Sequence, residues 1–418
     1  MRFRRSVYLV VLAVVLCGTV ADAQDYKYPY RDPYLATATS AILNSDRLKP
    51  RSKRDVVQVP GLPGRNRMPS LEGRGFMSVA FYRQDQPALL VFIVAGIGST
   101  PYFGLATYYA SLLHQEGSHV AVLPSPMSWN FALSSSRSGA PGYAPEDARD
   151  LYEAMQRTLA LLRKQGVKIT RVHFMGASLG ALEGAYLSVI DADEGKIGID
   201  KYPLINPPLD LAHALVKVDE WHALGATFGA DRAKALVAKA TNLVESHAKD
   251  RRDDPAIFAL VARDFAGFTR EELQFLVAEQ LQTTLPQLAY VARILQGHLT
   301  RAEAREEARK HRQDAKDVTL ANYREEVALP AWRRLAEEPD ADLQSFVTRG
   351  ALARILDRLR GNPRIHIMHN ADDFLAEPRA IAALKEALGD QVTLYPYGGH
   401  LGNLWYPDNR EAMVRFLR

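Results

Sequence analysis

Short apolar runs alternate with amphipathic helical patterns in two stretches of the chain, and this alternation predicts most of its secondary structure. The apolar runs predict buried strands, and the segments between them have helical periodicity. A mostly parallel sheet with helices on both faces produces this rhythm. The predicted strands span residues 89–95, 120–123, 172–175, 202–206, 365–368 and 392–395, and the main predicted helices span 145–164, 179–189, 378–388 and 411–417.

The rhythm stops between the fourth and the fifth of these strands. Residues 209–356 are nearly all helical in pattern, and Thr269 and Glu272 have the spacing of a capping box. A large helical domain inserted between two halves of one sheet explains this arrangement most simply. The apolar positions within residues 273–285 predict mainly the core of the insertion, and they are also candidates for lining a substrate entrance.

Two shorter features precede the alternation. Residues 55–59 and 76–82 predict short strands that form an antiparallel edge of the sheet. Residues 24–55 are polar, interrupted by prolines and weakly periodic, so we expect an extended arm that carries no chemistry.

The first residues have the pattern of a secretory signal peptide. Three arginines precede an uncharged apolar run at 7–17, and Ala21 and Ala23 supply small residues before a cleavage site. The run is about half the roughly 20 residues that a membrane-spanning helix needs. We therefore expect cleavage after Ala23 and a periplasmic or secreted protein without an integral membrane span. A lipoprotein anchored at Cys17 is the alternative, disfavoured because Leu16 stands where a small residue is normal.

Composition narrows the classes of function. The chain of 418 residues is 47% hydrophobic and 24% charged, as in ordinary globular proteins. Removing residues 1–23 takes away three arginines and one aspartate and leaves a net charge of +2, which suggests no nucleic-acid partner. Cys17 is the only cysteine, so the processed protein has no disulfide and no thiol chemistry.

The segment Gly176-Ala177-Ser178-Leu179-Gly180 follows the predicted strand 172–175 directly and precedes a predicted helix. A serine on such a sharp strand-to-helix turn is presented as a nucleophile. Small residues are needed two positions on either side of it, because the strained turn brings the strand and the helix close together. The motif by itself has low specificity, so its context decides its meaning.

A serine hydroxyl becomes a good nucleophile only when a base takes its proton and a carboxylate orients the base. His400 stands in a glycine-rich segment just after the last predicted strand, and we expect it to be the general base. Two acids, Asp372 and Asp373, follow the preceding strand.

The order of Ser178, an acid and then His400 resembles the α/β-hydrolase superfamily over residues 75–208 and 357–418. The resemblance implies an α/β-hydrolase fold with a helical cap. In that family apolar residues and a proline commonly follow the acid, which favours Asp373 and leaves Asp372 as the alternative acid or as a cap of the loop.

The resemblance also implies an oxyanion hole made by the main-chain N–H groups of Leu179 and Ile97, with Gly98 as the alternative second donor. A phosphate-binding role for Gly96 and Gly98 is disfavoured because no Walker-type lysine follows them. No metal site is expected. His366 and His369 would point to opposite faces of a strand, and the histidines of the insertion lack the spacing of metal ligands.

The sequence thus predicts an exported serine hydrolase that cleaves an ester, thioester or amide through an acyl-enzyme, most simply a carboxylesterase or lipase. The expected partner is a small-molecule or lipid-like acyl substrate, and neither a cofactor nor a metal is required. A serine peptidase on the same fold is one alternative. A catalytically silent binding protein of the cell envelope, with an α/β-hydrolase-like fold, is another. The loop at 124–141, which contains Ser134, Ser135, Ser136 and Ser138, is a candidate wall of the pocket.

The predicted organisation is a signal peptide at 1–23, an N-terminal arm with an edge strand at 24–75, core segments at 76–208 and 357–418, and a helical cap at 209–356.

Overall fold

The computed structural model describes residues 26–43, 54–65, 74–97, 99–102, 104–248, 256–298, 303, 306 and 318–418. The predicted signal peptide, with Cys17, and the alternative donor Gly98 lie outside these residues.

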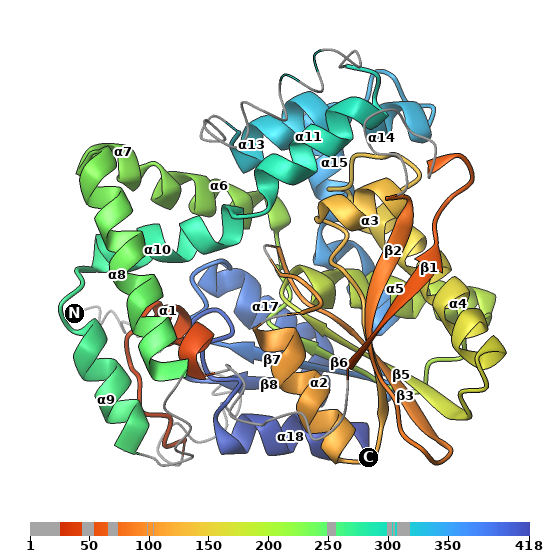
Figure 1. The fold of residues 1–418 in the computed structure, drawn as a ribbon, viewed down its shortest axis with the longest axis horizontal. Coiled ribbons are helices and arrows are strands. Elements are labelled where there is room, and N and C mark those ends of the chain that lie inside the picture. Colours follow the sequence, from red (N-terminus) through yellow and green to blue (C-terminus); the bar gives the residue numbers. More distant parts are fainter. Residues whose placement is uncertain are drawn as a thin grey trace, which may run out of the picture.

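One twisted sheet runs through the described part of the chain (Figure 1), and its strands follow the order β1-β2-β4-β3-β5-β6-β7-β8. The antiparallel pairs β1–β2 and β2–β4 form one edge, and all other neighbours are parallel. This is the arrangement of the predicted α/β-hydrolase fold. The strands are β1 Arg54–Pro60, β2 Phe76–Tyr82, β3 Ala88–Val94, β4 His119–Val122, β5 Ile169–Ala177, β6 Tyr202–Ile205, β7 Ile365–Asn370 and β8 Val392–Tyr395.

Helices cover both faces of this sheet. The chain runs outward from β3 to β4 through α2 and then returns past β3 to β5 through α4. Because parallel crossovers are right-handed, this reversal puts α2 and α4 on opposite faces. The reversal also leaves a crevice at the carboxyl ends of β3 and β5, where open α/β sheets bind ligands. The covering helices are α2 Leu105–Gln115, α4 Ala144–Lys164, α5 Leu179–Glu194, α17 Pro378–Leu388 and α18 Pro407–Leu417, and the turn η4 spans Gly389–Gln391.

Between β6 and β7 the described residues form helices and no strand, as expected for a helical insertion. Figure 1 shows two groups of these helices. Helices α6, α7 and α10 lie on one side, with α8 and α9 running down beside α1, and α11, α13, α14 and α15 lie together at the top of the view. Thr269 and Glu272 form the predicted capping box. The elements are α6 Leu211–His222, α7 Leu224–Phe228, α8 Ala230–Ala248, α9 Ala256–Phe265, α10 Arg270–Gln282, α11 Leu285–Leu295, α13 Leu320–Tyr323, the π-helical turn η2 Arg324–Ala328, α14 Leu329–Leu335, α15 Leu343–Gly350, the 3₁₀ turn η3 Leu352–Ile355 and α16 Leu356–Leu359.

The N-terminal segment is not the extended arm that the sequence predicts. Helix α1 spans Pro33–Leu43, and the side chains of Tyr26, Tyr28, Tyr30 and Tyr34 are buried. The tyrosines at alternate positions place their rings in an aromatic cluster; the ring centroids of Tyr28 and Trp405 lie 5.7 Å apart. Aromatic rings bury a large apolar area even when the surrounding sequence is polar, which explains why this segment packs.

The loop at 124–141 also differs from the expectation, because it contains the short helix α3 Trp129–Ser134. Among the helices that the structure describes, none is long and apolar enough to cross a membrane.

Candidate active site

Ser178 stands at the sharp turn between β5 and α5. Its backbone has φ 55° and ψ −126°, a conformation that costs energy in any residue with a side chain. A Cβ atom on Gly176 would lie 2.3 Å from the carbonyl oxygen of Gly180, and one on Gly180 would lie 2.2 Å from that of Val94. Neither glycine position has room for a side chain, so strand and helix approach as closely as the motif predicts.

Three side chains from distant parts of the sequence form a hydrogen-bonded row at the carboxyl edge of the sheet. Ser178 Oγ lies 2.8 Å from His400 Nε2, and His400 Nδ1 lies 2.9 Å from Asp373 Oδ2. All three residues are buried. An ionised carboxylate only accepts hydrogen bonds, so Nδ1 carries the proton of a neutral His400 and Nε2 accepts from the serine hydroxyl. The imidazole is therefore oriented to remove the proton of Ser178.

Asp373 is held ionised by its neighbours. Burial alone would raise the pKa of this carboxyl, but the adjacent His400, with help from His369 and the N–H of Leu375, holds it below its usual value. Asn206 Nδ2 also donates to Asp373 Oδ2, at 2.8 Å.

The sequence did not single out Asn206. This residue directly follows β6 and has a φ of 45°, a left-handed conformation that asparagine adopts more readily than most residues. Its position at the carboxyl end of a predicted strand was the one sequence feature that could have marked it as a candidate site residue.

Asp372 has a different role from its neighbour. Its carboxylate accepts from the N–H groups of Gly399, at 2.8 Å, and Gly398, at 3.2 Å. Burial raises the pKa of Asp372 to about 6, although these two hydrogen bonds lower it. Asp372 thus caps the loop that carries His400, while Asp373 contacts the imidazole.

Helix α1 supports the opposite side of this loop. The main-chain N–H of His400 donates to Thr37 Oγ1 at 2.9 Å. A Cβ atom on Gly399 would lie 2.2 Å from the carbonyl oxygen of Pro33, and one on Gly402 would lie 2.5 Å from the main chain of Ala36. The glycines around His400 therefore allow α1 to pack against the loop. The N-terminal segment, expected to carry no chemistry, fixes the backbone of the candidate base.

An aromatic group covers the acid side of the row. The ring of Phe374 stacks on Tyr34 of α1, with centroids 4.8 Å apart and planes 8° apart, and it meets Trp221 of α6 edge-on at 5.1 Å. The same ring lies 6.5 Å from the His400 imidazole. These rings exclude water from the His400 and Asp373 pair, which strengthens its electrostatic interaction.

The predicted oxyanion donors are Leu179, which directly follows Ser178, and Ile97, which follows a glycine that packs against Ser178. Leu179 is the first residue of α5, so its N–H has no intrahelical acceptor and lies at the positive end of the helix dipole. Ile97 follows Gly96, and a Cβ atom on Gly96 would lie 2.6 Å from Ser178 Cβ and 3.5 Å from Leu179 N. Only glycine at 96 leaves this space clear.

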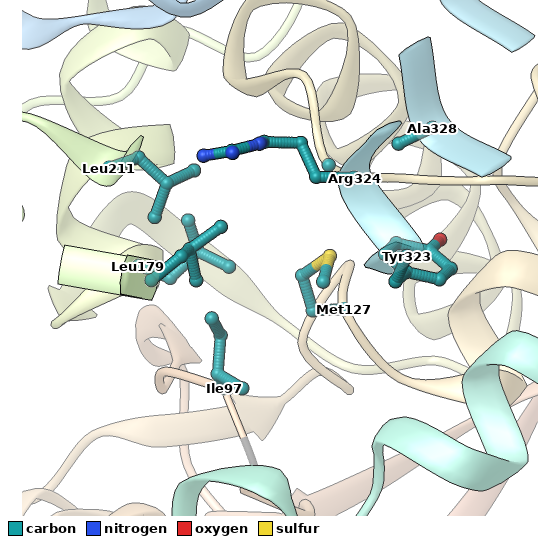
Figure 2. Close-up of a pocket in the computed structure, with 9 residues that line it drawn as sticks. Ile97, Met127, Leu179, Leu211, Tyr323, Arg324 and Ala328 are labelled. Atoms are coloured by element: carbon teal, nitrogen blue, oxygen red, sulfur yellow. The ribbon is translucent and has the colours of Figure 1, made fainter. Parts of the chain in front are cut away.

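A small, mainly apolar cavity is lined in part by Leu179, the residue that follows Ser178. The side chains of Ile97 and Leu179, the two predicted oxyanion residues, and groups from the cap form its wall (Figure 2). Sequence reasoning missed Arg324, which enters this cavity from the turn η2. The lining residues are Ile97, Met127, Gly142, Leu179, Leu211, Leu215, Tyr323, Arg324 and Ala328.

The remaining candidate residues lie elsewhere. None of the four serines at 134–138 lines this cavity, and Ser134 Oγ donates to the carbonyl of Asn130 inside its own helix. His366 contacts Thr393 Oγ1, and the ring of His369 faces main-chain carbonyls. Within the part of the chain that the structure describes, no group of three or more His, Cys, Asp or Glu side chains is arranged to hold a metal ion.

Comparison with known proteins gives likeness in fold alone. No protein-family model matches the chain, and no curated protein matches it. Among solved structures, brefeldin A esterase, a bacterial homologue of human hormone sensitive lipase, is 15% identical with a TM-score of 0.42, and the match covers 93% of this chain and 86% of the esterase.

Est1E from Butyrivibrio proteoclasticus is 10% identical with a TM-score of 0.40, covering 87% of this chain and 98% of Est1E. The thioesterase domain from the curacin biosynthetic pathway is 12% identical with a TM-score of 0.39, and the match covers 88% of this chain and 100% of that domain. Because these identities and TM-scores are low, the fold is assigned from the strand order of the sheet.

Proposed function

We propose that the protein is a serine hydrolase that cleaves a carboxylic ester through an acyl-enzyme, with Ser178 as nucleophile, His400 as general base and Asp373 as the orienting acid. The observation that carries the proposal is the row from Ser178 Oγ to His400 Nε2, at 2.8 Å, and from His400 Nδ1 to Asp373 Oδ2, at 2.9 Å. The left-handed backbone of Ser178 adds support, because strain of this kind persists at sites where function requires it.

The geometry supports the following reaction. His400 Nε2 takes the hydroxyl proton as Ser178 Oγ attacks the carbonyl carbon, and Asp373 stabilises the imidazolium that forms. The N–H groups of Leu179 and Ile97 stabilise the oxyanion of the tetrahedral intermediate. The imidazolium then gives its proton to the leaving oxygen, and an acyl-Ser178 ester remains. Water, activated by His400, releases the acid and restores the serine.

The cavity supports an ester with a partly apolar acyl group, because aliphatic side chains form most of its wall. A thioester or amide would use the same steps. The proposal includes the division into two core segments at 76–208 and 357–418 and a cap at 209–356. It also includes export, which rests on the sequence pattern of residues 1–23.

A fluorophosphonate probe tests the nucleophile. We expect the wild-type protein to be labelled, and we expect Ser178→Ala to lose labelling. Ser188→Ala, a change of another buried serine in the helix that follows Ser178, is the matched control and should be labelled as the wild type is. A folded wild-type protein that takes no label would favour the silent binding protein. Hydrolysis of p-nitrophenyl acyl esters, compared with aminoacyl arylamides, then distinguishes an esterase from a peptidase.

A further inference from the structure

A buried arginine stands in the otherwise apolar cavity that is lined in part by Leu179, the residue after the candidate nucleophile. Arg324 is 8% exposed, and it is the one charged residue among those that line this cavity in the described part of the chain. Figure 2 shows its guanidinium extending over Leu179 toward Leu211. Arg324 also lines a second, adjoining cavity with Tyr143 and Phe346, so it lies between the two spaces.

The hydrogen-bonding capacity of this guanidinium is not filled by the residues that the structure describes. Its Nε is buried and has no partner among them. The ion pair of Arg324 is with Glu325, at 3.1 Å, and the side chain of Glu325 is 53% exposed. An ion pair with an exposed carboxylate is weak because water and salt screen it. A buried guanidinium with an unfilled donor is costly, and an anion that enters the cavity removes that cost.

Arg324 lies in an irregular turn of the backbone. Arg324 begins the five-residue π-helical turn η2 between α13 and α14. Pro330, in the first turn of α14, has no N–H and would clash with the carbonyl four residues earlier in a regular helix. A widened turn relieves that clash, and π-turns of this kind occur frequently at functional sites.

From these contacts we propose that Arg324 binds a carboxylate at the far end of the substrate's acyl group, so that the preferred substrates are monoesters of dicarboxylic acids. A guanidinium matches the geometry of a carboxylate, with two parallel N–H donors. We assign the carboxylate to the acyl part because the cavity wall includes the side chains of Leu179 and Ile97, whose N–H groups hold the carbonyl oxygen in the proposed reaction. The aliphatic side chains that line the cavity together with Arg324 suit the methylene chain of such an acyl group. This inference rests on the proposed function.

Paired substrates test the charge. Each p-nitrophenyl monoester of adipic, suberic or sebacic acid is compared with the ester whose free carboxylate is replaced by a primary amide of the same shape. These chain lengths avoid the self-cleavage that a nearer carboxylate causes, and rates without enzyme are subtracted. We expect the wild type to favour the carboxylate of at least one pair by about 10- to 100-fold in kcat/KM, as hydrogen bonds to a charged group would give.

The variant Arg324→Met should bring this ratio close to one, and Arg324→Lys should keep part of it. Arg334→Met, which removes an exposed arginine from α14, is the matched control and should keep the wild-type ratio. A wild-type ratio near one, or a ratio that survives Arg324→Met, overturns the inference while hydrolysis of both esters leaves the proposed function intact. Esters that carry the free carboxylate on the alcohol part are compared in the same way. A preference for the carboxylate that appears only in those esters overturns the assignment to the acyl group.

Binding without turnover separates the two proposals. The melting temperature of the Ser178→Ala protein should rise with suberate and not with suberamide, and the rise should be absent in the protein that also carries Arg324→Met. If the wild type neither hydrolyses esters nor takes the fluorophosphonate label, but this shift is present, the hydrolase proposal fails and carboxylate binding by Arg324 stands. No shift with any of the three dicarboxylates contradicts the role of Arg324.

Discussion

The side chain of Thr37 accepts a hydrogen bond of 2.9 Å from the main-chain N–H of His400, which joins the first described helix to the loop of the candidate base. The same hydroxyl donates to the carbonyl of Pro33, so it is fixed in orientation by its own helix. A serine hydrolase depends on the position of its imidazole within a fraction of an ångström. The contact therefore makes Thr37 a positioning residue.

Thr37→Val keeps the shape of the side chain and removes the acceptor. We expect kcat for ester hydrolysis to fall by about tenfold, since an N–H group left without a partner costs about 1–3 kcal/mol. Thr37→Ser should restore most of the rate. Thr39→Val is the control: Thr39 is buried in the same helix and bonds to carbonyls of its own turn. Equal losses in both valine variants would mean that α1 acts only through general stability.

The two adjacent aspartates should respond differently to removal of charge. Asp373→Asn removes the carboxylate that orients His400, and we expect kcat to fall by about 10³–10⁴-fold with little change in folding. Asp372→Asn weakens the cap on Gly398 and Gly399 and should cost about 1 kcal/mol of stability and less than tenfold in rate. The measurements are kcat and the free energy of unfolding in denaturant for both variants. A larger loss of kcat in Asp372→Asn than in Asp373→Asn would make Asp372 the acid.

Gly96→Ala should impair the reaction without contact with any substrate group. The added methyl would lie 2.6 Å from Ser178 Cβ and 2.9 Å from Ser178 Oγ, so the serine must move. A displacement of the nucleophile by about 1 Å would lower the rate by about 100-fold. Gly267→Ala is the control, because a methyl there meets only the end of a lysine side chain at 3.6 Å. Normal fluorophosphonate labelling of Gly96→Ala would show that Ser178 tolerates the contact.

Glu183 should make stability depend on pH. It lies on α5 with no exposure, and neither carboxylate oxygen has a partner among the described residues. Burial, and then the charge of Asp147, raise its pKa well above the usual value. The unfolded chain ionises near pH 4.3 while the folded protein still holds the proton, so stability falls as pH rises above that value.

Glu183→Met removes this penalty at similar volume. We expect its melting temperature to exceed that of the wild type by a few degrees at pH 8 and by less at pH 5. Asp193→Asn, at an exposed site on the same helix, should show no comparable trend, since surface ion pairs contribute about 0–1 kcal/mol. A Glu183→Met advantage that is the same at both pH values would argue against a raised pKa of Glu183 in the folded protein.

The sheet was predictable because its strands are short apolar runs with helices between them. The limits of β8 match the prediction, and those of β3 differ by one residue at each end. Strand β5 begins three residues before the predicted start, at Ile169, where the exposed Arg171 interrupts the apolar pattern. Helix α1 was missed because it is short, with 11 residues, and lies in a polar segment interrupted by prolines. Short helices depend on tertiary packing, which contacts with the C-terminal loop supply here.

The residues of the candidate site also fall into those that local sequence predicts and those that depend on tertiary contacts. Ser178 and His400 stand in short motifs, so local sequence was enough to bring them into consideration. Thr37, Asn206 and Arg324 have no motif around them. Thr37 and Asn206 hydrogen-bond to residues far away in the chain, His400 and Asp373. Arg324 reaches the cavity through a π-turn in the cap, whose placement depends on packing that periodicity alone does not encode.

The packing of α1 under the His400 loop limits how this protein can be dissected. A shortened version that starts at β2 would retain every reactive group, yet Gly399 and Gly402 would lose the surface against which they fit. Such a fragment should fold around its sheet and have a loosened imidazole. Engineering that trims or fuses the N-terminal part of the molecule must therefore preserve residues 26–43, because this segment holds the loop of the candidate base in place.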